Sequence, residues 1–247
     1  MLEGQHALVT GGGTGIGLAI ARALKAAGAE VTIAGRRSGP LEEAGGGLRS
    51  LVMDVAQEDS VIEGVRAANA HAPITICVAN AGIAEGKSIA KTTLDFWQNM
   101  MRINLDGAML TIRECLPTMK EAGWGRVLAI SSIAGVRGLK GAPAYSASKH
   151  GMIGLIRSLS EDFMGSGITF NAICPGYVAT PIVDRNVVSI AERAGVSQEE
   201  ALKIMTSANP HGRLIEADEV AQAALWLCGP GSMSVNGTAV EIAGGQV

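Results

Sequence analysis

The chain has little charge and few groups that could hold a metal. Asp, Glu, Lys and Arg make up 17% of its 247 residues, against about a quarter in an ordinary soluble domain. The four cysteines lack the spacing of metal ligands, and the four histidines are equally dispersed. We therefore expect no metal site. We interpret the cysteines as small buried apolar residues in a reducing compartment: Cys77, Cys115, Cys174 and Cys228.

Further absences restrict the partners. The net charge is −3 and the basic residues do not cluster, which argues against a nucleic acid partner. The chain shows neither an N-terminal signal pattern nor an apolar run of membrane length. We expect a cytoplasmic protein that binds neither nucleic acid nor membrane.

Short apolar, β-prone runs alternate with helical stretches along the chain, and no linker, repeat or low-complexity segment interrupts them. This alternation predicts an α/β fold: one doubly wound parallel sheet, Rossmann-like, with helices on both faces, in a single domain over residues 1–247. The strand candidates are His6–Thr10, Val31–Ala34, Leu51–Met53, Ile74–Val78, Val127–Ile130, Ile168–Ile173 and Thr238–Ile242. The helical stretches include Leu18–Ala27, Ser60–Ala70, Leu94–Met119 and Tyr145–Met164.

A glycine-rich turn, residues 11–17, separates the first strand candidate from the first helix. A strand, a glycine turn and a helix form a context in which backbone N–H groups receive a phosphate. The strict G-x-G-x-x-G spacing fails here, because the glycines fall at Gly11, Gly15 and Gly17. The alternative is an ordinary glycine-rich loop.

The residues after the second strand candidate bear on the choice of nucleotide. A site for NAD usually places an acid there to bond the ribose hydroxyls. This chain has Gly35 followed by Arg36 and Arg37. A guanidinium suits a 2′-phosphate, so we favour NADP(H), with NAD(H) possible. A pair of solvated arginines on a loop is the alternative.

Tyr145 and Lys149 stand four residues apart in a helical stretch, with Ser132 upstream. Side chains at this spacing share one helix face, so we expect the ammonium to lie beneath the phenol and to lower its pKa toward the working range. The Ser132 hydroxyl could hydrogen-bond a carbonyl oxygen. A tyrosine packed beside a surface lysine is the alternative, since the spacing alone is a weak signal.

Taken together, these motifs resemble the short-chain dehydrogenase/reductase family of the compact type over nearly the whole chain. The resemblance implies a nicotinamide cofactor and a small-molecule carbonyl or alcohol substrate. Ala79 departs from the pattern, because it stands where the family has a first asparagine that ties strands together. The cofactor-binding residues implied are Gly11, Thr14, Gly15, Ile16, Gly17, Arg36, Arg37, Asp54, Val55, Asn80, Ala81, Gly82, Tyr145, Lys149, Pro175, Gly176, Val178 and Thr180.

The resemblance also implies a catalytic set of Asn104, Ser132, Tyr145 and Lys149. Tyr145 would exchange the proton with the substrate oxygen, and Ser132 would orient that oxygen. Lys149 would lower the pKa of Tyr145 and hold the nicotinamide ribose. Asn104 would hold a water that links Lys149 to solvent.

The segment at about 180–213 corresponds to the family's substrate lid. Its apolar residues favour a mostly apolar substrate, although they could merely pack the lid on the body: Ile182, Val183, Val187, Val188, Ile190, Ile204 and Met205. No basic residue stands out as a carboxylate clamp, although Arg185, Arg193 and Lys203 are available.

The chain is similar to both 3-oxoacyl-thioester reductases and 3-hydroxybutyrate dehydrogenases. Ala134 and Ala142 replace polar carboxylate-binding residues of the latter group, which favours a 3-oxoacyl thioester. The alternatives are an NAD-dependent dehydrogenase of a cyclic or aromatic secondary alcohol or ketone and, outside enzymes, a catalytically silent nucleotide-sensing protein.

Apolar residues cover more than one face of the helical stretches 145–164 and 223–228. Such a helix packs either on its own sheet and a second subunit or wholly inside one chain. The family usually assembles through these two regions, so the resemblance implies a homotetramer.

Overall fold

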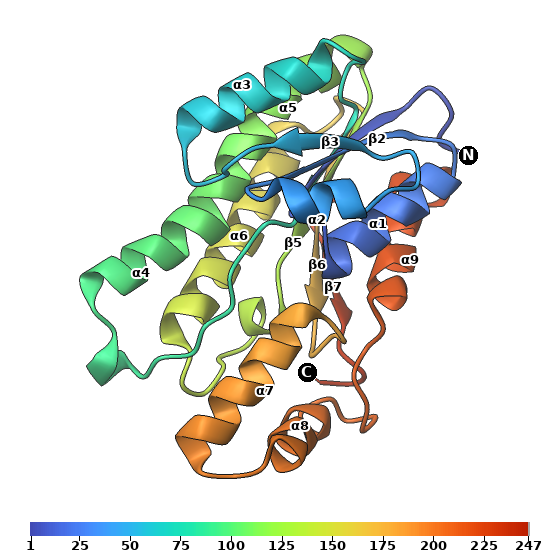
Figure 1. Ribbon diagram of the computed structural model, residues 1–247. Coiled ribbons are helices and arrows are strands. Elements are labelled where there is room, and N and C mark those ends of the chain that lie inside the picture. Colours follow the sequence, from blue (N-terminus) through green and yellow to red (C-terminus); the bar gives the residue numbers. More distant parts are fainter. Residues whose placement is uncertain (247) are drawn as a thin grey trace.

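The computed structural model describes residues 1–246, apart from the side chains at positions 184–186, 189, 190, 193 and 194. The described residues form a parallel sheet of seven strands in the order β3-β2-β1-β4-β5-β6-β7 (Figure 1). The strands are β1 His6–Thr10, β2 Glu30–Gly35, β3 Arg49–Val52, β4 Ile76–Ala79, β5 Gly125–Ile130, β6 Ile168–Pro175 and β7 Ala239–Ile242. The predicted doubly wound α/β sheet is confirmed.

Helices cover both faces of the sheet (Figure 1). One apolar cluster is contributed by α1 Gly15–Ala26, α2 Ser38–Glu43 and α9 Ala217–Cys228, and the other by α3 Glu58–Asn69, α5 Gly107–Ala122 and α6 Pro143–Asp162. Helix α4, Leu94–Met101, leads into α5. Short 3₁₀ turns lie at Ile89–Lys91, Ile133–Gly135 and Pro230–Ser232. Over the described part of the chain, every helix is too short or too polar to cross a bilayer.

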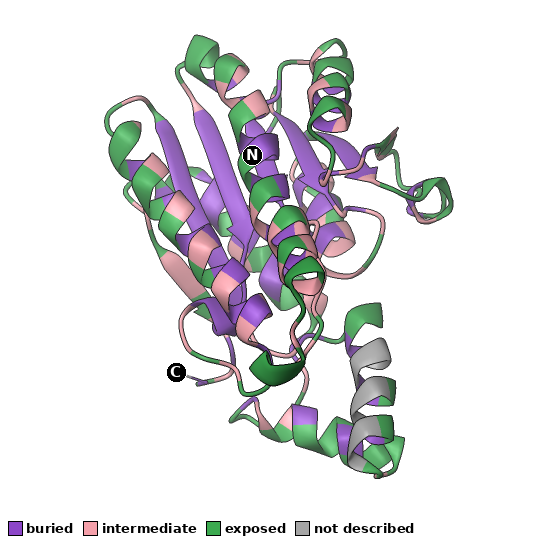
Figure 2. Cartoon of the chain, turned by 90° about the vertical axis from the view of Figure 1, so that its left-hand side faces the viewer, coloured by how far each residue is buried: buried purple, intermediate pink, exposed green. Residues whose placement is uncertain are grey.

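The central strands are buried at every position, β5 and β6 along their whole length (Figure 2). This explains why the sequence shows continuous apolar runs there and no alternation, because a parallel sheet is covered on both faces. Each large apolar side chain removed from water contributes about 1.5–3 kcal/mol. The four cysteines are free and buried in the described structure, as predicted.

The long helix predicted from Leu94 to Met119 is interrupted by a turn of π-helix, Arg102–Asp106. Where α5 resumes, a Cβ on Gly107 would lie 2.9 Å from the side chain of Val55. The helix therefore approaches the loop after β3 closely. The extra residue in the π-turn places Asn104 facing inward, with its side chain fully buried.

Two helices form a hairpin beyond the carboxyl ends of the strands: α7 Pro181–Ala194 and α8 Gln198–Ser207 (Figure 1). Gly195 ends α7 in the left-handed conformation, and Ser197 caps α8 with Glu200 in a capping box. The hairpin has an apolar cluster of its own, which includes Val183, Val187 and Met205. This hairpin occupies most of the predicted lid.

Candidate active site

Two cavities lie at the carboxyl ends of the strands in the described structure. The first, of about 340 Å³, extends from the glycine turn to the ends of β2, β4 and β5. The second, of about 380 Å³, lies between the ends of β5 and β6 and the α7–α8 hairpin. Six residues line both cavities: Ile16, Ala84, Ser131, Tyr145, Thr180 and Ile182. Tyr145 therefore stands where the two cavities meet.

The residues predicted to bind the cofactor divide between the two cavities. Most of them line the first: Gly11, Thr14, Gly15, Ile16, Gly17, Arg36, Arg37, Asp54, Val55, Asn80, Ala81, Gly82, Tyr145, Lys149 and Thr180. Pro175, Gly176 and Val178 line the second cavity instead, together with Ser132. Asn104 lines neither, because its side chain is enclosed behind Gly82.

The glycine turn is locked to the end of β4. The Asn80 amide donates to Thr10 O (2.8 Å) and Gly11 O (3.2 Å), and the Thr10 hydroxyl accepts from Asn80 N. A Cβ on Gly17 would run into Asn80 Nδ2, and Gly11 has a positive φ of 64°. Although Ala79 replaces the family's first asparagine, Asn80 and Thr10 tie the two strands together.

The first cavity has the donors that a dinucleotide requires. Helix α1 begins there, and the described structure has no capping hydrogen bond from the Thr14 side chain. The first N–H groups of the helix thus suit a phosphate. Arg36 and Arg37 are exposed at the rim, beside Gly35. Two guanidinium groups here fit a 2′-phosphate better than two free ribose hydroxyls.

Hydrogen bonds hold both the side chain and the backbone of Lys149. Its Nζ donates to Ile130 O (2.8 Å), and its carbonyl oxygen accepts from Ser131 Oγ (3.1 Å). The side chain is only 4% exposed. Burial lowers the pKa of Lys149 to about 8, and the neighbouring Cys174 thiol opposes this shift. The ammonium is therefore less firmly protonated than that of an exposed lysine.

The pKa of Tyr145 departs from the sequence-based expectation. The helical spacing predicts that Lys149 lowers this pKa, but burial raises it above its ordinary value. A hydrogen bond with Ser132 opposes the rise, while Tyr177 and Cys174 add to it. Lys149 Nζ lies 5.8 Å from the centre of the Tyr145 ring and is bonded to Ile130 O. At this separation, the cost of burying a phenolate outweighs the attraction of the ammonium.

The Asn104 side chain is fully engaged with its surroundings. Its Oδ1 accepts from Ile83 N (2.8 Å), and its Nδ2 donates to Ile83 O (3.0 Å) and Ser148 Oγ (3.1 Å). These bonds pin the loop after β4 to α6. A Cβ on Gly82 would lie 3.1 Å from Asn104 Oδ1 and 3.7 Å from Lys149 Nζ. The side chains of Asn104 and Lys149 therefore both approach the same glycine.

Sequence reasoning missed two residues of the site, Ser131 and Tyr177. Ser131 lines both cavities, and its hydroxyl donates a hydrogen bond to the backbone carbonyl of Lys149. Tyr177 lines the second cavity, and burial raises its pKa while Arg137 opposes the shift. Its place directly after Pro175 and Gly176 was the available signal, because those residues flank the site.

The lid's basic residues provide little support for a carboxylate clamp. Lys203 is exposed and pairs with Glu199 (2.9 Å). The side chains of Arg185, Arg193 and Ile190 lie outside the described residues. The second cavity does have one lysine in its lining, Lys140, for which the sequence predicted no role.

The family model, the relatives and the solved structure that this chain matches are all dehydrogenases or reductases. Residues 5–189 match the family model described as short chain dehydrogenase. The chain is 33% identical to D-beta-hydroxybutyrate dehydrogenase of Rhizobium meliloti (strain 1021), over 98% of both chains. It is 36% identical to acetoacetyl-CoA reductase of Shinella zoogloeoides, over 97% of both. A crystal structure of an actinorhodin polyketide ketoreductase variant with NADPH has a TM-score of 0.93 at 34% identity, covering 98% of this chain and 97% of that one.

Proposed function

Because this chain belongs to the short-chain dehydrogenase family and is an oxidoreductase that uses a nicotinamide nucleotide, we propose that it reduces a 3-oxoacyl thioester with NADPH. The same site would oxidise the 3-hydroxy compound in reverse. The observation that carries the proposal is the position of Tyr145 at the junction of the two cavities. A nucleotide in the first cavity and a carbonyl in the second would meet at this phenol.

A nicotinamide bound in the first cavity would supply or accept the hydride. Tyr145 donates the proton to the carbonyl oxygen, and its raised pKa keeps the phenol protonated at neutral pH. Ser132, within hydrogen-bonding reach of that phenol, holds the same oxygen. Lys149, mostly charged below about pH 8, stabilises the negative charge that Tyr145 acquires after it gives up the proton.

One of the two alanines and the apolar lining of the second cavity support a thioester. Ala142 lines the second cavity, whereas Ala134 is fully buried and outside the lining. Most of the remaining side chains around this cavity are apolar, among them Ile133, Leu139 and Val183. Such a lining suits an acyl chain better than a small free carboxylate. The likeness to an acetoacetyl-CoA reductase points the same way.

The second candidate is an NAD-dependent dehydrogenase of a cyclic or aromatic secondary alcohol or ketone. The same apolar lining favours it, since a ring would fill the space as well as a chain. A catalytically silent nucleotide sensor is the weaker alternative, because Ser132 and Tyr145 face one cavity and Lys149 lies next to them.

The test is the absorbance at 340 nm of purified protein with acetoacetyl-CoA and either NADPH or NADH. Rapid loss of NADPH is the expected result. If protein that binds NADPH or NADH consumes neither of them, the proposed substrate becomes a secondary alcohol or ketone.

The variant Arg36→Ala should weaken NADPH binding about tenfold and leave NADH binding nearly unchanged, because only NADPH carries the 2′-phosphate. Equal losses would show that Arg36 is only a loop residue.

We also propose that the chain works as one domain with a lid at about 180–213, and as a homotetramer in the cytoplasm without a nucleic acid partner. Exposed apolar and small residues on α5, α6 and α9 support the assembly: Met109 (37% exposed), Trp226 (49%) and Gly154. A net charge of −3 and four free buried thiols support the remaining points.

A further inference from the structure

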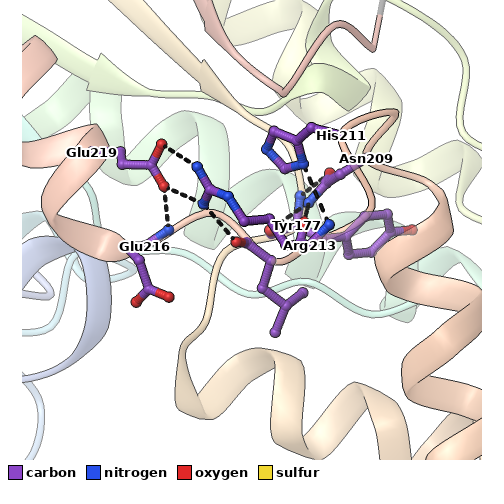
Figure 3. Close-up of polar contacts among 7 residues, drawn as sticks. Tyr177, Asn209, His211, Arg213, Glu216 and Glu219 are labelled. Carbon is purple, nitrogen blue, oxygen red and sulfur yellow. Dashed lines mark hydrogen bonds and ion pairs between the residues drawn. The ribbon is translucent and has the colours of Figure 1, made fainter.

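The loop after α8 holds the backbone of Tyr177 through one side chain, Asn209 (Figure 3). The Asn209 side chain is fully buried. Its Oδ1 accepts from Tyr177 N (3.1 Å), and its Nδ2 donates to Tyr177 O (2.9 Å). One amide thus satisfies both backbone polar groups of the tyrosine. The same Nδ2 also donates to Arg213 O (2.8 Å), which closes the loop on itself.

The fit around this amide is close. A Cβ on Gly176 would lie 2.6 Å from Asn209 Oδ1, so the residue before Tyr177 must be glycine for the amide to reach. Tyr177 O accepts a second bond from Ile215 N (2.9 Å), and Ala179 N donates to Ile215 O (2.9 Å). The Tyr177 backbone is therefore held by both the Asn209 side chain and the Ile215 backbone.

The far end of the loop is tied to the body of the protein. Arg213 makes a bidentate pair with Glu219 of α9 (2.6 and 3.0 Å), and Glu219 also accepts from Glu216 N (2.8 Å) (Figure 3). The hydrogen bonds from Arg213 lower the pKa of Glu219 to about 2. His211 packs against Gly244 of the C-terminal segment, where a Cβ would collide with its ring. The loop that carries Asn209 is thus attached to α9 and to the C-terminal segment.

The Tyr177 side chain connects the loop that carries Asn209 to the second cavity, where we place the substrate. It lines the second cavity and packs against the apolar cluster of the α7–α8 hairpin. Val183 and Met205 belong to that cluster and line the same cavity. Tyr177 is also close enough to Tyr145 to influence its pKa. The ring therefore forms a wall shared by the cavity and the hairpin.

We propose that Asn209 is a positioning residue for substrate binding: its amide fixes Tyr177 as a wall of the second cavity and so sets the affinity for the acyl part of the substrate. This inference rests on the function proposed above. Asn209 acts through Gly176 and Tyr177, which line the second cavity and not the first. Its loss should therefore affect the substrate and spare the nucleotide.

The experiment compares Asn209→Ala and Asn209→Asp with the control Ser207→Ala. Asn209→Asp keeps the size of the side chain but loses both donated hydrogen bonds, which guards against a fold lost only through a cavity. Ser207 is exposed near the same loop. In the described structure its hydroxyl donates one hydrogen bond, to Ile204 O. The readouts are KM and kcat with acetoacetyl-CoA, the Kd of NADPH, and hydrogen exchange of residues 176–179 by mass spectrometry.

Both Asn209 variants should raise KM for the thioester about tenfold, with kcat and the Kd of NADPH changed less than about threefold. Exchange at residues 176–179 should accelerate, because Tyr177 N loses its acceptor in the alanine variant. Ser207→Ala should match the wild type. Unchanged exchange in Asn209→Ala, or a fall in kcat and nucleotide affinity at constant KM, would overturn the proposal. If the wild type leaves acetoacetyl-CoA unreduced, the proposed function fails, and exchange alone then decides whether Asn209 holds Tyr177.

Discussion

Lys149 is a charged group that the fold buries without a carboxylate partner among the described residues. Its pKa falls from an ordinary 10.5 to about 8, and this difference corresponds to roughly 3 kcal/mol of lost stability when the amine is charged in both states. The unfolded chain binds the proton more tightly between about pH 8 and 10.5. Stability contributed by this group therefore increases as pH rises through that window.

The variant Lys149→Met should accordingly be inactive and yet melt several degrees above the wild type at pH 7. The excess should shrink as pH rises from 8 to 10.5, because the wild-type amine then becomes neutral in the folded state first. Scanning calorimetry at pH 7, 8.5 and 10 measures the difference. A methionine variant less stable than the wild type at pH 7 would show that the hydrogen bond to Ile130 O outweighs the cost of burial.

Tyr145 is the only residue to which we assign the transferred proton. Tyr145→Phe should lower kcat at least about a thousandfold and leave the Kd of the nucleotide within about twofold, because the phenyl ring keeps the shape of both cavities. Steady-state rates and nucleotide fluorescence titration measure the two quantities. Activity above about a tenth of the wild-type rate would remove Tyr145 from its role.

At the scale of elements, His6 joins three segments at the amino end of the sheet. It lies in β1, its Nδ1 donates to Ala72 O after α3 (2.7 Å), and its Nε2 accepts from Thr32 of β2 (2.8 Å). Burial lowers its pKa, the bond to Ala72 opposes the shift, and His71, Glu30 and Arg49 are the titratable groups around it. The folded state therefore holds this imidazole neutral, with the proton on Nδ1.

Because the folded pKa of His6 lies below that of the unfolded chain, about 6.5, stability is complete above that pH and is lost as pH falls toward the folded value. We expect the melting temperature to fall between pH 7 and 5. His6→Leu should be less stable at pH 7 but should show a flatter pH dependence. The control His71→Gln removes a lesser influence on His6 and should keep most of the wild-type slope, because burial is the largest cause of the His6 shift. An equal slope in His6→Leu would mean that other groups govern acid unfolding.

The order and type of most elements could be predicted from the sequence, because a sheet buried on both faces leaves continuous apolar runs. The π-turn at residues 102–106 could not, since it depends on how closely Gly107 approaches Val55, which lies far away in sequence. Helix α2 has only six residues and buries one of them, Leu41, so it leaves no periodic pattern.

The same division applies to the candidate site. Motifs that end strands indicated which residues would gather, since carboxyl ends of parallel strands meet at one edge of the sheet. The direction of the Tyr145 pKa was predicted wrongly, because helical spacing shows that Lys149 is near but not that Ile130 O holds its ammonium. Asn209 left no signal, because its partner Tyr177 is 32 residues away.

At the scale of the whole molecule, the proposed tetramer predicts that a second subunit covers part of α5, α6 and α9. Gly154 of α6 is exposed, and a Cβ added there would meet no atom within 4 Å in the described structure. A single chain thus has no need for glycine at this position, and a large residue would fit it. A second subunit packed on α6 would require glycine, because a side chain there would hold the two helices apart.

Gly154→Arg should therefore fold with a nearly unchanged melting transition for the single chain but lose the tetramer. Light scattering after gel filtration should give four chains of 25.3 kDa for the wild type and one or two for the variant. Glu63→Arg, on the exposed side of α3, introduces an arginine outside the proposed contact and should remain tetrameric. A wild type that elutes as a single chain would refute the assembly. If Gly154→Arg remains tetrameric, the contact lies elsewhere, with the edge strand β7 and Trp226 of α9 as the remaining surface.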